Sequence, residues 1–133
     1  MKYDTLIRQA LIIDGSNTPG YVADVGLLAG RIESIGDLSA AVAEHHIEAA
    51  GRVLAPGFID VHTHDDTVVI RQPQMLPKLS QGVTTVIVGN CGISAAPVSL
   101  LGDPPDPMNL LGRRDAFAYP RFADYRQAVE NAQ

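Results

Sequence analysis

Apolar positions in the first third of the chain come in short runs, each of which ends at turn-forming residues. Residues 3–13 are apolar with polar interruptions, and residues 14–17 (Asp-Gly-Ser-Asn), which follow them, favour a turn. Two further runs, residues 23–29 and 31–35, flank Gly30, which takes the positive φ of a tight turn without steric cost. This pattern predicts a strand followed by a β-hairpin.

Residues 40–50 show no clear hydrophobic period. They are rich in alanine, and the pattern leaves a helical turn and a loop both open. The segment contains His45 and His46, whose adjacent side chains point apart on either a strand or a helix. We therefore interpret these two residues as solvated surface histidines rather than as a pair of metal ligands.

The pattern changes at residue 53. Residues 53–64 are apolar almost throughout rather than alternating, which is typical of a parallel strand buried on both faces. The Pro56-Gly57 step within this run favours a break at the entrance of the strand over one continuous central strand. A second run of this kind covers residues 83–88 and ends at Gly89-Asn90-Cys91-Gly92.

The segment between these two runs predicts a crossover helix. Residues 67–81 include the apolar pair Met75 and Leu76 and are followed by Gly82, a residue common just past the end of a helix. Strand, helix and strand over about thirty residues make a βαβ unit, so the predicted class is α/β. Several prolines then disfavour regular structure, before residues 121–133 take up the apolar spacing of a helix.

Composition and charge indicate a globular protein and exclude some classes of partner. Of the 133 residues, 46% are hydrophobic and 19% are charged, which allows a packed core and argues against intrinsic disorder. Fifteen acidic and ten basic residues give a net charge of −5 without any basic cluster. Nucleic acid is therefore not an expected partner. No apolar stretch approaches the ~20 residues of a membrane-spanning helix, so no membrane partner is expected.

The cellular compartment is predicted from two features. The first residues, Met1 to Asp4, do not lead into the apolar core of a signal peptide. Cys91 is the one cysteine of the sequence, which excludes an internal disulfide. Both features favour a reducing, cytoplasmic location.

The sharpest local feature is His62-Thr63-His64, at the end of an apolar run. Side chains two residues apart on a strand point to the same face, so the two imidazoles are predicted to stand together. They lie at the carboxyl end of the strand, where α/β proteins place their sites. Neutral imidazole binds zinc and similar metals, and Asp65 and Asp66 follow directly as further ligands or as hydrogen-bond acceptors. A pair of ordinary strand-end histidines is the alternative.

Cys91 is the second candidate, because it follows the next strand along the chain. Neighbouring parallel strands lie ~4.8 Å apart, which brings the thiol within reach of His62 and His64. Three interpretations stay open for Cys91. It is a thiolate metal ligand, a buried and inert thiol, or a nucleophile that has a histidine as its base.

Taken together, these residues resemble a known family. Residues 53–64 (VLAPGFIDVHTH) are similar to the opening barrel strand of the amidohydrolase superfamily, which includes hydantoinases and dihydroorotases. Asp65-Asp66 and residues 81–97 (QGVTTVIVGNCGISAAP) narrow the resemblance to the N-acyl-D-amino-acid deacylases, or D-aminoacylases. The similarity is loose up to Gly51 and close from Arg52 to Pro97.

The resemblance implies a fold and a division of the chain. It implies that residues 1–52 supply strands of a small β-sandwich and that residues 53–133 begin a (β/α)8 metal-dependent hydrolase barrel. This second part is incomplete, because it holds the first two of eight barrel strands. The chain is accordingly expected to be an N-terminal fragment.

The resemblance also implies a metal site and a reaction. His62 and His64 would bind the weaker metal position, and Cys91 would bind zinc at the stronger one. The family's two other histidine ligands and its general-base aspartate lie beyond this chain, so no catalytic residue is assigned within it. The expected reaction is zinc-dependent hydrolysis of a small-molecule substrate, an N-acyl-D-amino acid, to a carboxylate and a D-amino acid. The fragment alone is expected to be inactive.

Two alternatives stay open at this stage. The chain could come from another amidohydrolase, of the dihydropyrimidinase-like or dipeptidase-like kind, since a fold does not fix a function. It could also be a truncated, non-catalytic module that serves in binding or assembly. The acyl group, the D-amino acid, the number of metals and the oligomeric state are not fixed by the sequence.

Overall fold

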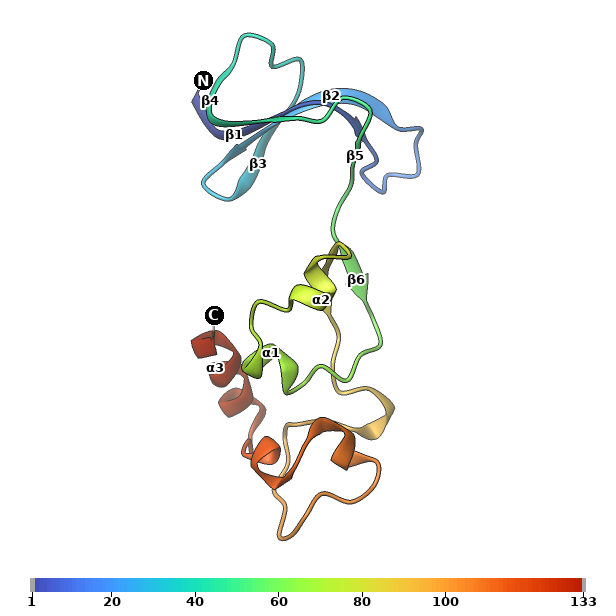
Figure 1. Cartoon of the computed structure of the whole chain (residues 1–133), viewed down its shortest axis with the longest axis vertical. Helices are drawn as coiled ribbons and strands as arrows, with labels where there is room; N and C mark the ends of the chain where they lie inside the picture. Colours follow the sequence, from blue (N-terminus) through green and yellow to red (C-terminus); the bar gives the residue numbers. More distant parts are fainter. Residues whose placement is uncertain (1, 133) are drawn as a thin grey trace. The chain divides into compact units, whose positions relative to one another are not determined.

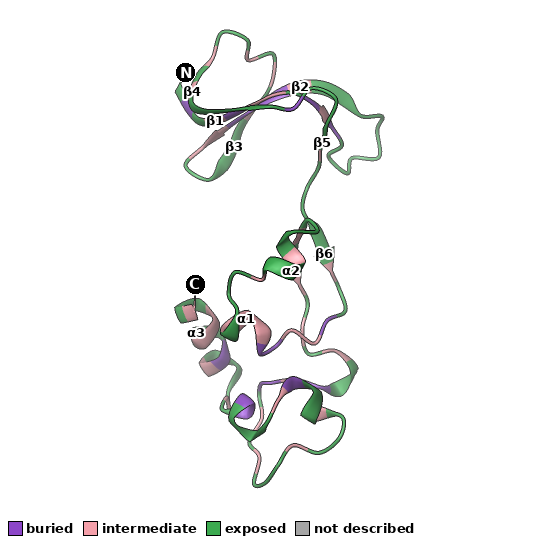
Figure 2. Cartoon of the chain, in the orientation of Figure 1, coloured by how far each residue is buried: buried purple, intermediate pink, exposed green. Residues whose placement is uncertain are grey.

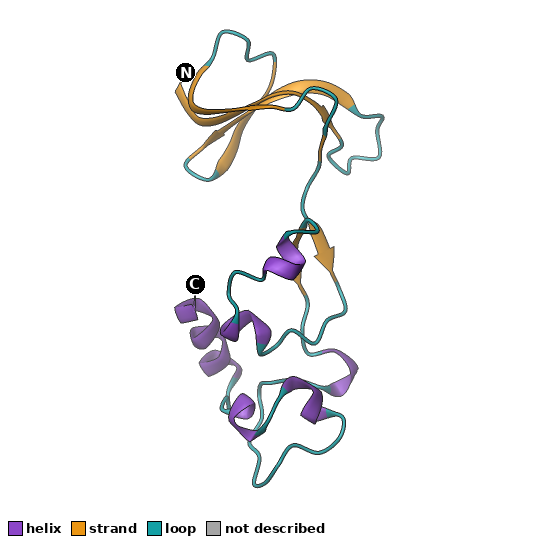
Figure 3. Cartoon of the chain, viewed as in Figure 1, coloured by secondary structure: helices purple, strands orange, loops and turns teal. Residues whose placement is uncertain are grey.

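The computed structural model describes residues 2–132, which divide between Pro56 and Gly57 into two compact units. The first unit is built from strands and turns, whereas the helices lie in the second (Figures 1 and 3). The predicted α/β content is thus distributed unevenly between the units, and each is described by itself.

The first unit is a five-stranded sheet in which β1 is central. The order is β3-β2-β1-β4, and β5 also pairs with β1. The predicted strand and hairpin are confirmed, because β1 pairs antiparallel with β2, and β2 pairs antiparallel with β3 across a turn with positive φ at Ala29 and Gly30. The strands are β1 (Lys2–Ile12), β2 (Tyr21–Leu28), β3 (Arg31–Gly36), β4 (Val42–Glu48) and β5 (Val53–Leu54).

Residues 40–50 form neither a helical turn nor a loop. They contain β4, which runs parallel to β1 in a register that pairs Lys2 with Val42 and Arg8 with Glu48. The hydrogen bonds that hold this strand come from a partner forty residues away, so its local sequence carries little sign of it. His45 and His46 are both exposed, as expected for surface histidines.

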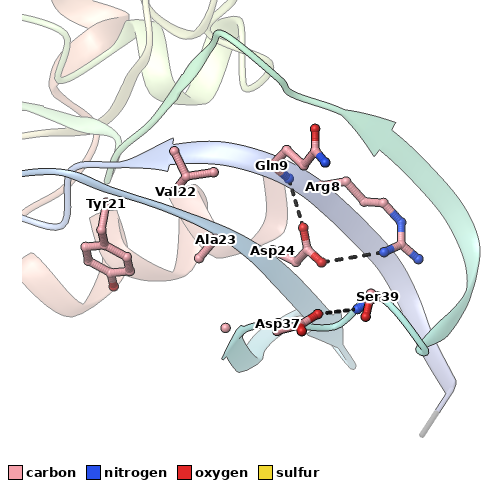
Figure 4. A pocket seen from close by; sticks show the side chains of 9 residues that line it. Arg8, Gln9, Tyr21, Val22, Ala23, Asp24, Asp37 and Ser39 are labelled. Atoms are coloured by element: carbon pink, nitrogen blue, oxygen red, sulfur yellow. Dashed lines mark hydrogen bonds and ion pairs between the residues drawn. The ribbon is translucent and has the colours of Figure 1, made fainter.

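A buried carboxylate shapes the middle of the sheet (Figure 4). The pairing of β1 with β2 shifts between Ile7 and Ala10, where Gln9 takes a φ of 54°. Asp24, 8% exposed, accepts hydrogen bonds from the backbone N–H of Gln9 at 2.9 Å and of Leu38 at 3.2 Å. Its Oδ2 also lies 3.5 Å from the guanidinium of Arg8. The bulge in β1 is therefore stabilised by a side chain of β2.

The apolar run 53–64 is broken at Pro56-Gly57, as its sequence predicts. Val53 and Leu54 pair in parallel with Leu11 and Ile12 of β1 and belong to the first sheet. The run resumes as β6 (Phe58–Asp60) in the second unit. The first compact unit ends at Pro56, because backbone pairing with β1 continues to Leu54.

The second unit opens with the predicted βαβ arrangement. β6 pairs in parallel with β7 (Val83–Val86). The segment between them, in which a short helix is expected within residues 67–81, holds two single-turn helices, α1 (Val68–Arg71) and α2 (Leu76–Leu79). Pro73 and the left-handed backbone of Met75, at a φ of 45°, separate the two helices.

The expected burial of β6 on both faces is wrong for this structure. Phe58 is 66% exposed, Ile59 61% and Val61 67% (Figure 2). The continuous apolar pattern predicts a strand that is covered on both faces. Among the described residues β6 has one partner strand, β7, and no helix covers either of its faces.

The core of the second unit lies after β7. The predicted C-terminal helix is confirmed as α3 (Phe122–Ala132), which directs Tyr125 inward. Between β7 and α3 the chain forms three short 3-10 turns, η1 (Asn90–Gly92), η2 (Met108–Leu111) and η3 (Arg114–Phe117). The buried residues of this core are Ile93, Ala95, Ala96, Leu111, Ala116, Phe117 and Tyr125. None of the helices within residues 2–132 has the length and apolarity needed to cross a bilayer.

Candidate metal site

The structure brings the three predicted metal-binding residues together. Each of His62, His64 and Cys91 has a ligand atom within 4.8 Å of those of the other two. Nε2 of His62 lies 3.0 Å from Sγ of Cys91. The rings of His62 and His64 are 5.9 Å apart between centroids and inclined by 79°. Two strands that are adjacent in space, but separated by a helical segment in sequence, therefore present two imidazoles and a thiol to one point.

Backbone pairing beyond β6 sets the position of the histidines. The N–H of Ile87 donates to the carbonyl of Asp60 at 2.9 Å, and the N–H of Thr63 donates to the carbonyl of Ile87 at 3.2 Å. The hydroxyl of Thr63, a residue only 5% exposed, donates to the same carbonyl. The two histidines thus flank a buried residue that is fixed to the neighbouring strand, and both of their side chains lie outside the core.

Cys91 is held in an uncommon backbone conformation. It has a φ of 57° and a ψ of 22°, in the left-handed region, between Gly89 at a φ of 79° and Gly92 at 71°. For a residue with a Cβ this conformation costs roughly 1–2 kcal/mol, and such residues concentrate at functional sites. The amide of Asn90 fixes the turn, because it donates to the carbonyls of Ile87 at 2.8 Å and Thr63 at 3.3 Å.

The two aspartates that follow His64 lie apart from this cluster. Asp65 points to Lys78, with its Oδ2 at 3.0 Å from the ammonium. Asp66 is 1% exposed and accepts a hydrogen bond of 3.1 Å from the N–H of Ala95. Within residues 2–132 neither is grouped with the three ligand candidates. Asp66 instead connects the segment after the histidines to the segment after Cys91.

Two charged residues beside the histidines were not singled out from the sequence. Asp60 accepts a hydrogen bond from the N–H of His62 at 3.3 Å and forms an ion pair of 2.7 Å with Lys78 of α2. The hydrogen bond from Lys78, and then that from His62, lowers the pKa of Asp60. The same contact with Asp60, followed by that with Asp65, raises the pKa of Lys78. Both side chains therefore stay charged at neutral pH.

The donor set fits a zinc ion. Imidazole nitrogen and thiolate sulfur are the ligands of tetrahedral zinc sites, with ligand distances of roughly 2.0–2.3 Å, so ligand atoms around one ion lie less than about 4.6 Å apart. The distance from His62 to Cys91 is below this limit, and the ligand atoms of all three residues lie within 4.8 Å of one another, so a small movement of the side chains would suffice for one ion. Nδ1 of His64 is buried and has no hydrogen-bond partner among the described residues, which suits an atom whose partner is a metal.

Two imidazoles and a thiol at the carboxyl ends of paired parallel strands define a candidate metal centre in an α/β protein. A model of the amidohydrolase family matches residues 46–133. The chain is 51% identical to a D-aminoacylase of Alcaligenes xylosoxydans xylosoxydans, over 96% of this chain and 26% of the relative. This chain belongs to the amidohydrolase family.

Solved structures of relatives agree with this assignment. A D-aminoacylase with a binuclear metal centre matches with a TM-score of 0.89 and 49% identity, over 96% of this chain and 27% of that one. An N-acyl-D-glutamate deacylase from Bordetella bronchiseptica, in complex with zinc and a phosphonate mimic of the tetrahedral intermediate, matches with a TM-score of 0.86 and 44% identity. This match covers the whole of the present chain and 28% of the deacylase chain. The chain spans about a quarter of the length of these relatives.

Proposed function

We propose that this chain forms part of a zinc-dependent N-acyl-D-amino-acid deacylase, in which His62, His64 and Cys91 are metal ligands. The observation that carries the proposal is the convergence of these three side chains, with 3.0 Å between Nε2 of His62 and Sγ of Cys91. The relatives support the substrate class, since they are a D-aminoacylase and an N-acyl-D-glutamate deacylase. The substrate proposed is a small molecule, an N-acyl-D-amino acid.

The proposal includes the architecture of the parent protein. The sheet of the first unit would be part of a small β-sandwich, and β6 and β7 would be the first two strands of a (β/α)8 barrel. The exposed apolar side chains of β6 and of the residue after it support this arrangement, because Phe58 and Ile59 of β6, and Val61 beyond it, are the kind of residue that barrel neighbours cover. The position of the three ligand candidates at the carboxyl ends of the strands also supports it.

The residues of this chain would act by binding and orienting. When bound, zinc supplies Lewis-acid chemistry, which polarises an amide carbonyl and lowers the pKa of bound water far below its ordinary value, towards ~7. Thr63 and Asn90 hold the histidine segment and the Cys91 turn at a fixed separation. Among residues 2–132 no carboxylate is grouped with the three ligand candidates, and the family resemblance implies that the general-base aspartate lies beyond this chain.

Activity assays on two forms of the protein test the proposal. The 133-residue chain, incubated with zinc and N-acetyl-D-methionine, should release no amine, because the general base and the later histidine ligands are missing from it. A form extended to the length of its relatives should hydrolyse the D-substrate and not N-acetyl-L-methionine. His64→Ala should abolish that turnover. If the 133-residue chain hydrolysed the substrate and His64→Ala abolished that activity, the proposal that the general base lies outside this chain would be contradicted.

A further inference from the structure

One ammonium group joins the two ends of the histidine segment. Nζ of Lys78, on α2, lies 2.7 Å from Oδ2 of Asp60 and 3.0 Å from Oδ2 of Asp65. Asp60 directly precedes Val61-His62, and Asp65 directly follows His64. The three side chains are partly sheltered, at 27% exposed for Lys78, 33% for Asp60 and 18% for Asp65.

We propose that Lys78 is a positioning residue for the metal-binding histidines, an inference that rests on the metal site proposed above. By holding Asp60 and Asp65 on one cation, Lys78 fixes the two ends of the segment that carries His62 and His64. Asp60 passes the constraint on directly, because its Oδ1 accepts the backbone N–H of His62 at 3.3 Å.

The remaining contacts of the segment show why this bridge is needed. Backbone hydrogen bonds hold the carbonyls of Asp60 and Asp65, and Thr63 anchors the centre of the segment, but none of these bonds holds the carboxylates of Asp60 and Asp65. Neither histidine is buried, and none of the described residues hydrogen-bonds Nδ1 of His64, so packing alone does not fix the two imidazoles. Without Lys78 the two carboxylates would have no shared counter-charge, and their repulsion would move the side chains of Asp60 and Asp65 apart on either side of the histidines.

Positioning and simple electrostatics make opposite predictions for Lys78. A cation beside a metal site repels the metal, so its removal would tighten metal binding if charge alone mattered. Loss of a residue that orients metal ligands instead weakens metal affinity, by about 10–100-fold in comparable sites. The sign of the change therefore separates the two roles.

Cobalt(II) titration of the 133-residue chain tests the proposal without recourse to activity. Co²⁺ substitutes for zinc, and the thiolate-to-cobalt charge-transfer band reports binding at Cys91. Lys78→Met should weaken Co²⁺ affinity by about 10–100-fold. Lys78→Arg should restore most of it, because a guanidinium also bridges two carboxylates. The matched control is Lys2→Met, which removes an exposed lysine paired with Glu44 in the first unit and should leave affinity unchanged.

Each outcome decides the matter. Unchanged or tighter Co²⁺ binding by Lys78→Met would overturn the role of Lys78 while leaving the metal site intact. Absence of the charge-transfer band in the unsubstituted chain would overturn the metal site, and the role of Lys78 with it. If circular dichroism shows that Lys78→Met is unfolded, the Co²⁺ affinity of Lys78→Gln is measured instead. Glutamine keeps most of the aliphatic part of the side chain, but its neutral amide cannot neutralise two carboxylates.

Discussion

The hydroxyl of Tyr125 donates a hydrogen bond of 2.8 Å to the backbone carbonyl of Asp66, fifty-nine residues earlier in the chain. Both residues are buried, at 7% and 1% exposed. The carboxylate of Asp66 accepts the N–H of Ala95 in turn. α3 is thereby connected to the segment that follows the histidines and, through it, to the segment that follows Cys91.

This contact predicts a loss of stability at alkaline pH. Burial, and then the nearby charge of Asp66, raises the pKa of Tyr125 to about 12 from its ordinary value of 10.0. The folded state therefore holds the phenol proton more tightly than the unfolded state does. The resulting stabilisation is complete below pH 10 and is lost as the pH rises towards 12. A shift of this size corresponds to about 2–3 kcal/mol.

Tyr125→Phe isolates this effect. At pH 8 the variant should be less stable by about 1–3 kcal/mol, because the carbonyl of Asp66 loses its donor. Between pH 10 and 12 the unsubstituted chain should lose that advantage, because the variant has no phenol to ionise. Urea midpoints measured from pH 8 to 12 follow the difference, and a difference that stays constant over this range would count against the shift.

Cys91 should be required for tight zinc binding. In a form extended to the length of the relatives, Cys91→Ala should lose tightly held zinc, whereas Cys91→Asp or Cys91→His should retain part of it, because carboxylate and imidazole also bind zinc. Zinc that remains after desalting, measured by atomic absorption, gives the result. Cys91→Gly is the folding control, since glycine accepts the φ of 57° and should stabilise the turn by roughly 1 kcal/mol while losing the metal.

Cys91→Ala also distinguishes a metal-ligand role of Cys91 from a role as nucleophile. The contact of 3.0 Å between His62 and Cys91 suits a thiol with its base as well as a pair of metal ligands. If the Cys91→Ala variant of a form extended to the length of the relatives kept all of its zinc but lost activity, Cys91 would be a nucleophile and not a metal ligand.

Gly26 should not tolerate a side chain. A Cβ at this position would lie 2.5 Å from Cε1 of Tyr3, whose ring is buried between strands at 4% exposed. Gly26→Ala should therefore destabilise the first unit by about 1–3 kcal/mol through overpacking. Gly102→Ala, with no atom within 4 Å of the added Cβ, should stay within roughly 0.5 kcal/mol of the unsubstituted chain. Thermal unfolding compares the two, and equal effects would refute the packing argument.

Local patterns predicted the elements whose partners are near in sequence. The hairpin around Gly30 and the helix that carries Tyr125 follow from turn chemistry and apolar spacing, and both are confirmed. β4 was missed because its ladder with β1 is built from residues forty positions apart. The short helix expected within residues 67–81 corresponds to α2, whereas α1 is a separate turn that the hydrophobic pattern does not distinguish, and Pro73 and the left-handed backbone of Met75 lie between the two.

The residues of the candidate site likewise fall into those that the sequence predicts and those that it does not. The proximity of His62, His64 and Cys91 was predictable, because two parallel strands place the residues that follow them at one edge. Lys78 was not predictable, since a lone lysine on a one-turn helix carries no spacing signal. Its meeting with Asp60 depends on how the crossover segment folds back over the strand that precedes it.

The pairing of β1 has a consequence for the order of events during synthesis. Its partner strands β2, β4 and β5 all lie within the first 54 residues, so among the described residues the backbone pairing of β1 uses no strand that is translated later. The ribosome adds about 5–20 residues per second, and 29 residues separate His62 from Cys91, so the thiol would follow the imidazoles by roughly 1–6 seconds. A nascent chain with a finished first sheet would then present two histidines before any thiolate is available to select zinc.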